Sequence, residues 1–177
     1  AVLCASDWVG SETFMLLLGD HLYKSDRSRS CARQVVDCFN ELGASNSVVG
    51  IYNEELKHVE HYGTVSGTWE EAGVLSLATI KEKPTADYAA EYLAVERNKK
   101  EEFFCVNGIY VLTPRLFSIL REHENERGAD GGELELTAAL EKLMSAEHCY
   151  GCEVDGSHFD TGLPKMFVAT VSQFAEK

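Results

Sequence analysis

The residues of this sequence most suited to chemistry lie in three short polar segments, each of which follows an apolar run. The segments are Gly19-Asp20, Lys81-Glu82-Lys83-Pro84 and Asp160-Thr161-Gly162. In an open α/β sheet, ligands collect at the carboxyl ends of strands. Polar residues that emerge there are exposed to a ligand, so the three segments are candidates for one shared site.

The residue types in these segments suit phosphoryl or nucleotidyl transfer. Two carboxylates from separate segments, Asp20 and Asp160, could hold one Mg²⁺ against phosphate oxygens. Lys83 could neutralise a second phosphate as a point charge, and Glu82 has oxygens that could accept hydrogen bonds from sugar hydroxyls. Such transfer depends on positioning and charge neutralisation more than on a covalent nucleophile. Taken singly, each segment also has a structural interpretation as a turn or a helix cap.

Apolar patterns predict the elements that would position the first segment. Phe14–Leu18 is a continuous apolar run, which is typical of a strand buried on both faces. Residues 28–42 predict a helix, because Val35 and Phe39 recur on one face at helical spacing. Residues 47–52 are again strand-like. A strand, a helix and a strand in this order form a crossover unit, which implies parallel pairing.

The rest of the chain predicts an antiparallel excursion followed by helices and strands. Residues 62–69 and 74–80 alternate in polarity and are expected to form a hairpin. Further helices are expected at residues 85–97, 113–123, 133–144 and 163–176, strands at 103–112 and 150–159, and a charged loop at 96–102. The expected fold class is α/β with a mixed sheet, in a single domain over residues 1–177.

Composition narrows the classes of partner and compartment. The net charge is −13, and the basic clusters at residues 24–33 and 97–100 read as solvated faces, so no nucleic acid is expected as a partner. No run approaches the roughly 18 apolar residues of a membrane span, and no secretory signal is visible. The six cysteines are scattered, and Cys149-Tyr-Gly-Cys152 is a lone pair without further zinc ligands at suitable spacing. We therefore expect no membrane partner and a reducing, cytoplasmic compartment.

Several motifs in fixed order resemble a known enzyme family. They read LLLGDHLY, HYGTV, IKEKP, GIYVLTP, GGELELTAAL and FDTG. Together they resemble the sugar-nucleotide pyrophosphorylases, which are nucleotidyltransferases, and especially bacterial-type UTP–glucose-1-phosphate uridylyltransferases. The resemblance implies a mixed, mostly parallel, Rossmann-like sheet flanked by helices, of the nucleotide-diphospho-sugar transferase type. It also implies the reaction of UTP with glucose 1-phosphate to give UDP-glucose and pyrophosphate.

The resemblance also implies roles for individual residues. Asp20 and Asp160 match the two aspartates that bind Mg²⁺, and Lys83 matches the lysine that grips the sugar phosphate. These three are the expected catalytic residues. Contacts to the sugar and its phosphate are assigned to five positions: Gly63, Glu82, Lys83, Val106 and Glu133.

The sequence departs from the family pattern in three places. It contains no glycine-rich GxGTRxxP loop, so the resemblance covers the C-terminal two-thirds of the family's fold, without the N-terminal nucleotide-binding strands. His21 stands where an acidic residue or Asn is usual, and residues 85–102 form a longer segment than is common. We therefore expect a fragment of a larger nucleotidyltransferase domain, with little turnover alone.

Two alternatives to this uridylyltransferase remain open. One is a non-catalytic sugar-phosphate-binding or regulatory module of the same ancestry. The other is a thymidylyl- or adenylyltransferase relative, because the residues that read the base would lie in the absent strands. Without those strands the segment Phe14–Leu18 would have an unpaired apolar edge. We expect this edge to be covered by a second copy of the chain or by a missing N-terminal segment.

Overall fold

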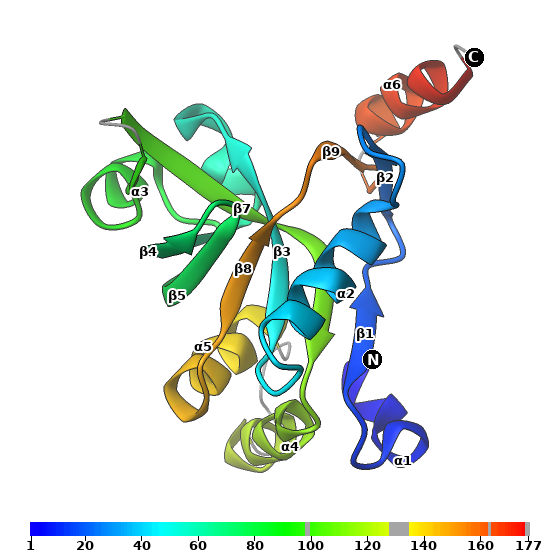
Figure 1. The fold of residues 1–177 in the computed structure, drawn as a ribbon, viewed down its shortest axis with the longest axis vertical. Coiled ribbons are helices and arrows are strands. Elements are labelled where there is room, and N and C mark those ends of the chain that lie inside the picture. Colours follow the sequence, from blue (N-terminus) through cyan, green and yellow to red (C-terminus); the bar gives the residue numbers. More distant parts are fainter. Residues whose placement is uncertain (98–99, 128–134, 163, 176–177) are drawn as a thin grey trace.

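The computed structural model describes residues 1–97, 100–127, 135–162 and 164–175. One long strand, β7, pairs with β1, β3, β4 and β6 in the main sheet, whose order is β1-β7-β3-β8-β5-β4. A separate two-stranded ribbon pairs β2 with β9 (Figure 1). The strands are β1 (Phe14–Leu17), β2 (His21–Ser25), β3 (Val48–Glu54), β4 (Gly63–Glu71), β5 (Val74–Glu82), β6 (Val95–Arg97), β7 (Lys100–Leu112), β8 (Tyr150–Glu153) and β9 (Gly156–Asp160).

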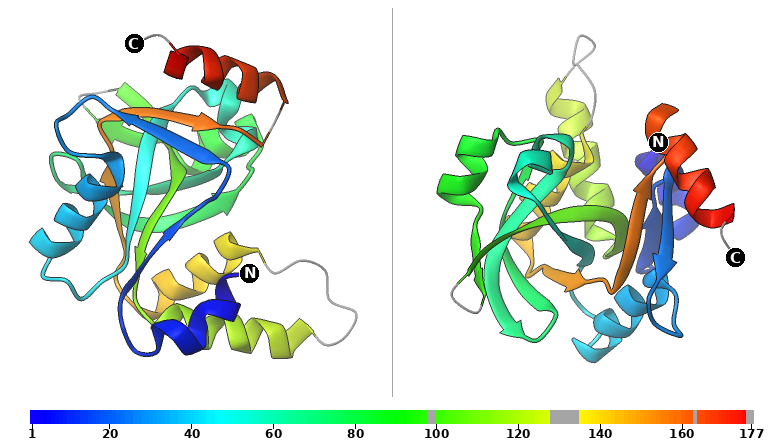
Figure 2. Two further views of the ribbon diagram at one scale, coloured as in Figure 1. Left: turned by 90° about the vertical axis from the view of Figure 1, so that its right-hand side faces the viewer. Right: turned by 90° about the horizontal axis from the view of Figure 1, so that it is seen from above.

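Helices cover both faces of the main sheet, so the expected α/β fold with a mixed sheet flanked by helices is confirmed. Figure 2 shows the β2–β9 ribbon beside this sheet, with the last helix against it. The helices are η1 (Val2–Ala5), α1 (Ser6–Val9), α2 (Cys31–Glu41), η2 (Leu56–His61), α3 (Ala86–Tyr92), α4 (Arg115–Arg127), α5 (Leu136–Ala146) and α6 (Pro164–Ala175).

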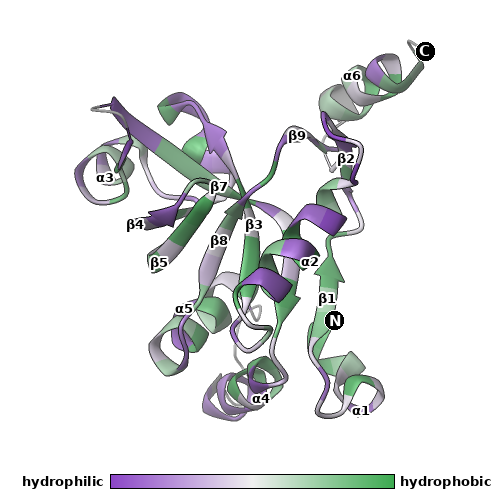
Figure 3. Ribbon diagram, viewed as in Figure 1, coloured by the Kyte–Doolittle hydropathy of each residue, from purple (hydrophilic) through white to green (hydrophobic). Residues whose placement is uncertain are grey.

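The helix α2 forms because its sequence has a cap and one apolar stripe. The Ser30 side chain accepts a hydrogen bond from the Arg33 amide at 3.2 Å and so caps the first turn. The buried residues of the helix recur at the spacing of a single face: Cys31, Gln34, Val35, Cys38 and Phe39. Figure 3 shows the complementary pattern, with hydrophilic colour on the outward side of α2 and hydrophobic colour on β1 and β3.

Strand β7 is buried on both faces, as a central strand must be. Ile109 and Val111 pack in the layer of α2, whereas Tyr110 and Leu112 pack in the layer of α4 and α5. Alternating side chains of one strand thus serve two different cores. The two layers meet at β7, so the backbone next to Val106 and Asn107 is held from both sides.

The expectation of a mostly parallel sheet is wrong. Among the pairings that the structure describes, only β3 with β8 is parallel, and the others are antiparallel. The first crossover does place β1 and β3 in the same direction. They do not pair with each other, however, because β7 lies between them and is antiparallel to both.

Strand β1 differs from its expected burial. It lies at the end of the sheet path, as expected of an unpaired edge, but one face is only half-buried and the other is exposed. Phe14 stacks on Phe117 with ring centroids 4.8 Å apart, whereas Met15 and Leu17 remain 38% and 49% exposed. The interpretation as a strand buried on both faces is therefore wrong for this part of the chain.

Most of the other expected elements are present with shifted ends. The hairpin is confirmed as β4 and β5, and the helices at residues 28–42 and 113–123 as α2 and α4. The charged run 96–102, expected to be a loop, instead contributes to β6 and to the start of β7. Strand β2 was not expected at all. A polar ribbon of five residues carries too little apolar periodicity to be predicted from sequence.

Two expectations from composition, on the cysteines and on membrane spans, can also be compared with the described residues. All six cysteines lie in them, and each is a free thiol there. No helix of the described segments is long and apolar enough to cross a membrane.

Candidate functional site

The β2–β9 ribbon brings Asp20 and Asp160 together. Asp160 is the register partner of His21, and Asp20 directly precedes that residue. The amide and the hydroxyl of Thr161 both donate to the Asp20 carbonyl at 2.7 Å, which ties the two chain segments together. One ligand atom each from Asp20, His21 and Asp160 lies within 4.8 Å of the others. Two residues 140 positions apart in sequence thus share one end of the ribbon.

A glycine beside the two carboxylates keeps the space between them open. The Gly162 amide donates to Asp160 Oδ1 at 2.8 Å. A Cβ atom at Gly162 would lie 3.1 Å from Asp160 Oδ1 and 3.2 Å from Asp20 Oδ2. Both carboxylates therefore converge over this position, and a side chain there would push at least one of them away.

The donor set fits a hard divalent cation. Two carboxylates approach each other, and among the described side chains no lysine or arginine forms an ion pair with either. The side chain of Asp20 is 59% exposed, so water can complete a coordination shell. Oxygen ligands with several retained waters are what Mg²⁺ takes in proteins.

Two histidines, His21 and His158, lie next to the carboxylates. His21 Nδ1 is 2.8 Å from His158 Nε2 and 3.2 Å from the Asn107 carbonyl oxygen. The Tyr23 hydroxyl donates to the same carbonyl at 2.7 Å. Burial, with a smaller contribution from His21, lowers the pKa of His158 to about 4, so this imidazole is neutral at neutral pH. From sequence, His21 is expected only as a departure from the family pattern, and His158 carries no signal of its own.

The backbone of β7 adopts an unusual shape to place the Asn107 carbonyl. Gly108 has φ +81°, and a Cβ there would lie 2.6 Å from His21 Nδ1 and 2.8 Å from the Tyr23 hydroxyl. The pairing of β3 with β7 shifts register opposite this point, between Val49 and Ile51. An Asn-Gly pair inside an apolar strand was the sequence signal for this irregularity.

A second cluster forms where β4 and β5 meet β7 and α5. Gly63 is the register partner of Glu82, and a Cβ on Gly63 would lie 3.3 Å from both Glu82 Oε2 and Val106 Cγ2. The Thr137 hydroxyl donates to Glu82 Oε2 at 2.5 Å. Three of the residues expected to contact the hexose therefore converge. Thr137, within the GGELELTAAL motif, was not singled out from sequence.

Lys83 lies at the edge of this second cluster. Its backbone has φ +42°, which is rare for a residue with a side chain, and its amide donates to the Tyr62 carbonyl at 3.1 Å. Lys83 Nζ is 3.9 Å from Glu82 Oε1, and the side chain is 63% exposed. The ammonium group is thus available to an anionic ligand.

The two clusters adjoin each other through Tyr62 and β7. Tyr62 precedes Gly63, and its ring centroid is 6.0 Å from that of His158. Burial and the charge of Asp160 both raise the pKa of Tyr62, so its hydroxyl stays protonated. Val106 of the second cluster directly precedes Asn107 of the first. Glu133, the remaining residue expected to contact the sugar, lies outside the described residues.

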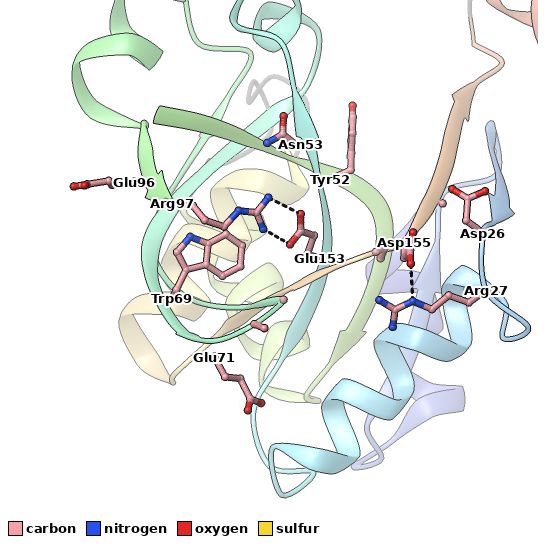
Figure 4. A pocket seen from close by; sticks show the side chains of 14 residues that line it. Asp26, Arg27, Tyr52, Asn53, Trp69, Glu71, Glu96, Arg97, Glu153 and Asp155 are labelled. Carbon is pink, nitrogen blue, oxygen red and sulfur yellow. Dashed lines mark hydrogen bonds and ion pairs between the residues drawn. The ribbon is translucent and has the colours of Figure 1, made fainter. Parts of the chain in front are cut away.

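A cavity of about 910 Å³ opens near the other end of the β2–β9 ribbon (Figure 4). Two of its acidic groups, Glu153 and Asp155, are paired with arginines, whereas Asp26, Glu71 and Glu96 on its wall form no ion pair among the described side chains. Arg97 donates to both carboxylate oxygens of Glu153, at 2.5 and 3.1 Å, and lies 5.0 Å from the centre of the Trp69 ring. Arg27 pairs with Asp155 at 2.7 Å. None of the site residues expected from sequence lines this cavity.

The chain is similar in sequence to several named enzymes, although no family model matches it. It is 29% identical over all of its 177 residues to a UTP–glucose-1-phosphate uridylyltransferase of Staphylococcus epidermidis, and covers 55% of that protein. It is 30% identical over 177 residues to UTP–glucose-1-phosphate uridylyltransferase 2 of Staphylococcus saprophyticus, again covering 55%. For the Bacillus subtilis enzyme the identity is 29%, over 99% of this chain and 54% of the relative.

Solved structures share the fold. An apo UDP-glucose pyrophosphorylase superimposes with a TM-score of 0.82 at 24% identity, over 99% of this chain and 58% of the other. A UTP-bound UGPase from Acinetobacter baumannii gives a TM-score of 0.76 at 22% identity, over 98% of this chain and 54% of the other. The chain thus spans slightly more than half the length of the relatives it matches. The resemblance stated from the sequence motifs is confirmed over the whole chain.

Proposed function

We propose that this chain, similar along its whole length to UTP–glucose-1-phosphate uridylyltransferases, is the metal- and sugar-phosphate-binding part of such a nucleotidyltransferase. The observation that carries the proposal is the convergence of two independent residue sets. Asp20 and Asp160 approach each other beside the cluster of Gly63, Glu82 and Val106. A phosphorylated hexose needs both sets at once, one for its phosphate and one for its hydroxyl groups.

In the proposed reaction, a phosphate oxygen of glucose 1-phosphate attacks the α-phosphorus of UTP in line, and pyrophosphate leaves. Mg²⁺, when held by Asp20 and Asp160, would neutralise charge on the phosphate oxygens. Lys83 binds the phosphate of the sugar through an exposed ammonium group. Glu82, oriented by the Thr137 hydroxyl, accepts hydrogen bonds from the hexose.

The lack of a side chain at Gly63 also favours binding of the hexose. A Cβ atom there would approach both Glu82 and Val106, so a larger residue would fill the space next to the backbone. We propose that the hexose takes this space and contacts the backbone of Gly63 and Val106. The work of the protein is then to hold the sugar phosphate in line with its target.

Titration calorimetry with glucose 1-phosphate, with and without MgCl₂, tests the proposal. We expect binding that Mg²⁺ strengthens and that Lys83→Gln weakens by about tenfold or more. Lys81→Gln is the matched control, since Lys81 lies near the end of β5, two residues before Lys83. Absence of binding in both conditions would contradict the proposal.

The same titration distinguishes a non-catalytic module from a part of an enzyme. Binding that ignores Mg²⁺ and is unchanged by Asp160→Asn would favour a sugar-phosphate-binding or regulatory module. Turnover is tested by adding UTP and measuring pyrophosphate. Because this sequence contains no GxGTRxxP loop, we expect little pyrophosphate from the chain alone.

We further propose that the exposed edge at β1 is covered by a second copy of the chain. The strand ends the sheet path and leaves Met15 and Leu17 partly exposed. Unpaired strand edges with apolar side chains favour association. Analytical ultracentrifugation should show concentration-dependent dimerisation, which Met15→Lys weakens. A monomer at all concentrations would contradict this proposal.

A further inference from the structure

We propose that His21 is a third protein ligand of the metal ion held by Asp20 and Asp160, and that it shifts the preference of the site from Mg²⁺ towards Mn²⁺ and Co²⁺. The inference rests on the proposed function, in which these two aspartates hold a metal ion. It adds a nitrogen donor that the aspartate pair alone would not supply.

The position of the imidazole is the first argument. One donor atom each of Asp20, His21 and Asp160 lies within 4.8 Å of the others, and His21 Nε2 is 3.9 Å from Asp20 Oδ1. Ligands at about 2.1 Å from one ion lie roughly 3 Å apart when adjacent and about 4.2 Å apart when opposite. A small rotation of the exposed Asp20 side chain would therefore bring all three donors onto one ion.

The hydrogen bonding of the other ring nitrogen is the second argument. His21 Nδ1 faces the Asn107 carbonyl oxygen, which can only accept a hydrogen bond and also accepts one from Tyr23. The favourable arrangement therefore places the His21 proton on Nδ1, where His158 Nε2 can share it. This leaves the Nε2 lone pair free on the side of the carboxylates. A backbone carbonyl that fixes the tautomer in this way is the usual partner of a metal-binding histidine.

Packing holds the imidazole in this orientation. The side chain of His21 is only 11% exposed, and its ring lies against that of His158 with centroids 4.5 Å apart. On the other side, Gly108 allows the backbone to come so close that a Cβ there would be 2.6 Å from Nδ1. A ligand that is already oriented loses little conformational freedom when it binds a metal.

The chemical consequence follows from the donor set. Carboxylates and water suit Mg²⁺, whereas an imidazole nitrogen favours later first-row ions, in the order Mn²⁺, then Co²⁺. The resemblance places an acidic residue or Asn at this position, so the imidazole distinguishes this chain. The other five histidines give natural controls, and His148 is the most useful because it is exposed and bonded to Ser76 Oγ.

The test is direct detection of nitrogen bound to the metal, using MnCl₂ alone and no substrate. We expect pulsed electron paramagnetic resonance of bound Mn²⁺ to show coupling to an imidazole ¹⁴N in the wild-type chain and in His148→Asn. His21→Asn should lose this coupling. Calorimetric titrations with MnCl₂, CoCl₂ and MgCl₂ should show that His21→Asn lowers the ratio of Mn²⁺ to Mg²⁺ affinity by about tenfold.

Two results would overturn the inference. One is bound Mn²⁺ without ¹⁴N coupling in the wild-type chain, and the other is an unchanged affinity ratio in a folded His21→Asn variant. Circular dichroism checks folding, and if His21→Asn unfolds, the wild-type coupling alone decides. Failure of the proposed function has a different signature, because nitrogen-coupled Mn²⁺ would then be present while glucose 1-phosphate fails to bind.

Discussion

The two ends of the β2–β9 ribbon differ in whether their acidic groups are paired with arginines. At the cavity end, Asp155 pairs with Arg27, and Glu153 nearby pairs with Arg97. At the other end, Asp20 and Asp160 face each other, and among the described side chains no lysine or arginine pairs with them. Asp155 and Glu153 at the cavity end therefore already have cationic partners, although Asp26, Glu71 and Glu96 on the cavity wall form no ion pair among the described side chains. The end of the ribbon that carries Asp20 and Asp160, here called the open end, has carboxylates without a lysine or arginine partner among the described side chains.

This difference separates carboxylates that are paired with arginines from the two carboxylates proposed to hold a metal ion. A half-buried arginine between two carboxylates holds strands together, and removing one member leaves charge uncompensated. Two carboxylates that approach without a counter-ion repel each other, so the fold keeps them together only by other contacts. Here those contacts include the pairing of β2 with β9 and the two hydrogen bonds from Thr161 to the Asp20 carbonyl. The cavity lies at the end of the ribbon opposite to the candidate metal site.

The largest expected effect comes from removing one carboxylate of the open end. Asp160→Asn keeps the size of the side chain but removes its charge, so Mn²⁺ affinity should fall by about 100-fold. Asp155→Asn is the matched control at the cavity end and should leave Mn²⁺ affinity unchanged. Both are measured by titration calorimetry. An equal fall in Mn²⁺ affinity in both variants would contradict the distinction between the two ends.

The next effect concerns stability at the cavity end. Arg97 lies 2.5 Å from Glu153 and 2.7 Å from Glu102, and these side chains are largely shielded from water. Arg97→Met should lower the free energy of unfolding by about 2 kcal/mol, less than for a fully buried pair. Urea denaturation measures this change, and Mn²⁺ affinity should stay the same.

Arg27→Met is the control for the Arg97 variant. Arg27 is exposed and pairs with Asp155 at the surface, so its removal should change stability little. If Arg97→Met and Arg27→Met were equally stable, the half-buried ion pair would contribute no more to the free energy of unfolding than the exposed one. If Arg97→Met lost metal affinity, the two ends would not be independent.

A smaller effect is expected from narrowing the open end. A methyl group at Gly162 would press on both carboxylates at 3.1–3.2 Å, so Gly162→Ala should weaken Mn²⁺ binding by about tenfold. At Gly19 an added Cβ would meet nothing within 4 Å. Gly19→Ala therefore adds the same methyl group beside Asp20 without the contact. Unchanged binding in Gly162→Ala would show that the carboxylates do not converge over this glycine.

Much of the fold was predictable because its apolar patterns are local. Val35 and Phe39 mark the buried face of α2, and the alternation of β4 and β5 marks their hairpin. The order of strands was not predictable in the same way. That β7 enters between β1 and β3 depends on pairing over about 50 to 100 residues, which no local pattern encodes. The apolar character of both faces of β7, at Ile109 and Tyr110, was the only local sign of a central position.

The candidate site was predictable where short motifs carry it. Asp20 and Asp160 could be paired because their motifs resemble those of a family, and the ribbon brings them together. His158 lacked such a signal, since a single histidine in an alternating strand looks like many others. Thr137 lay within a quoted motif, but its hydroxyl matters only once α5 is placed against Glu82. Side chains that act through a neighbour are thus the ones that sequence reasoning misses.

The smallest expected effect tests whether the thiols of Cys149 and Cys152, just before and within β8, compete with Asp20 and Asp160 for metal. Burial raises the pKa of the Cys149 thiol from its ordinary value of 9.0 to about 12, so at pH 7.5 it stays protonated and is a poor ligand. Co²⁺ should therefore bind without thiolate-to-metal charge-transfer absorption, and Cys149→Ser should leave its affinity unchanged. A thiol reagent should modify only the exposed Cys4 of the native chain.

The thiol of Cys149 ionises near pH 9 in the unfolded chain but only near pH 12 in the folded chain. The free energy of unfolding should therefore fall as pH rises from 9 towards 12. Charge-transfer absorption at pH 7.5 would instead place the metal at the cysteines and remove the contrast between the two ends of the ribbon.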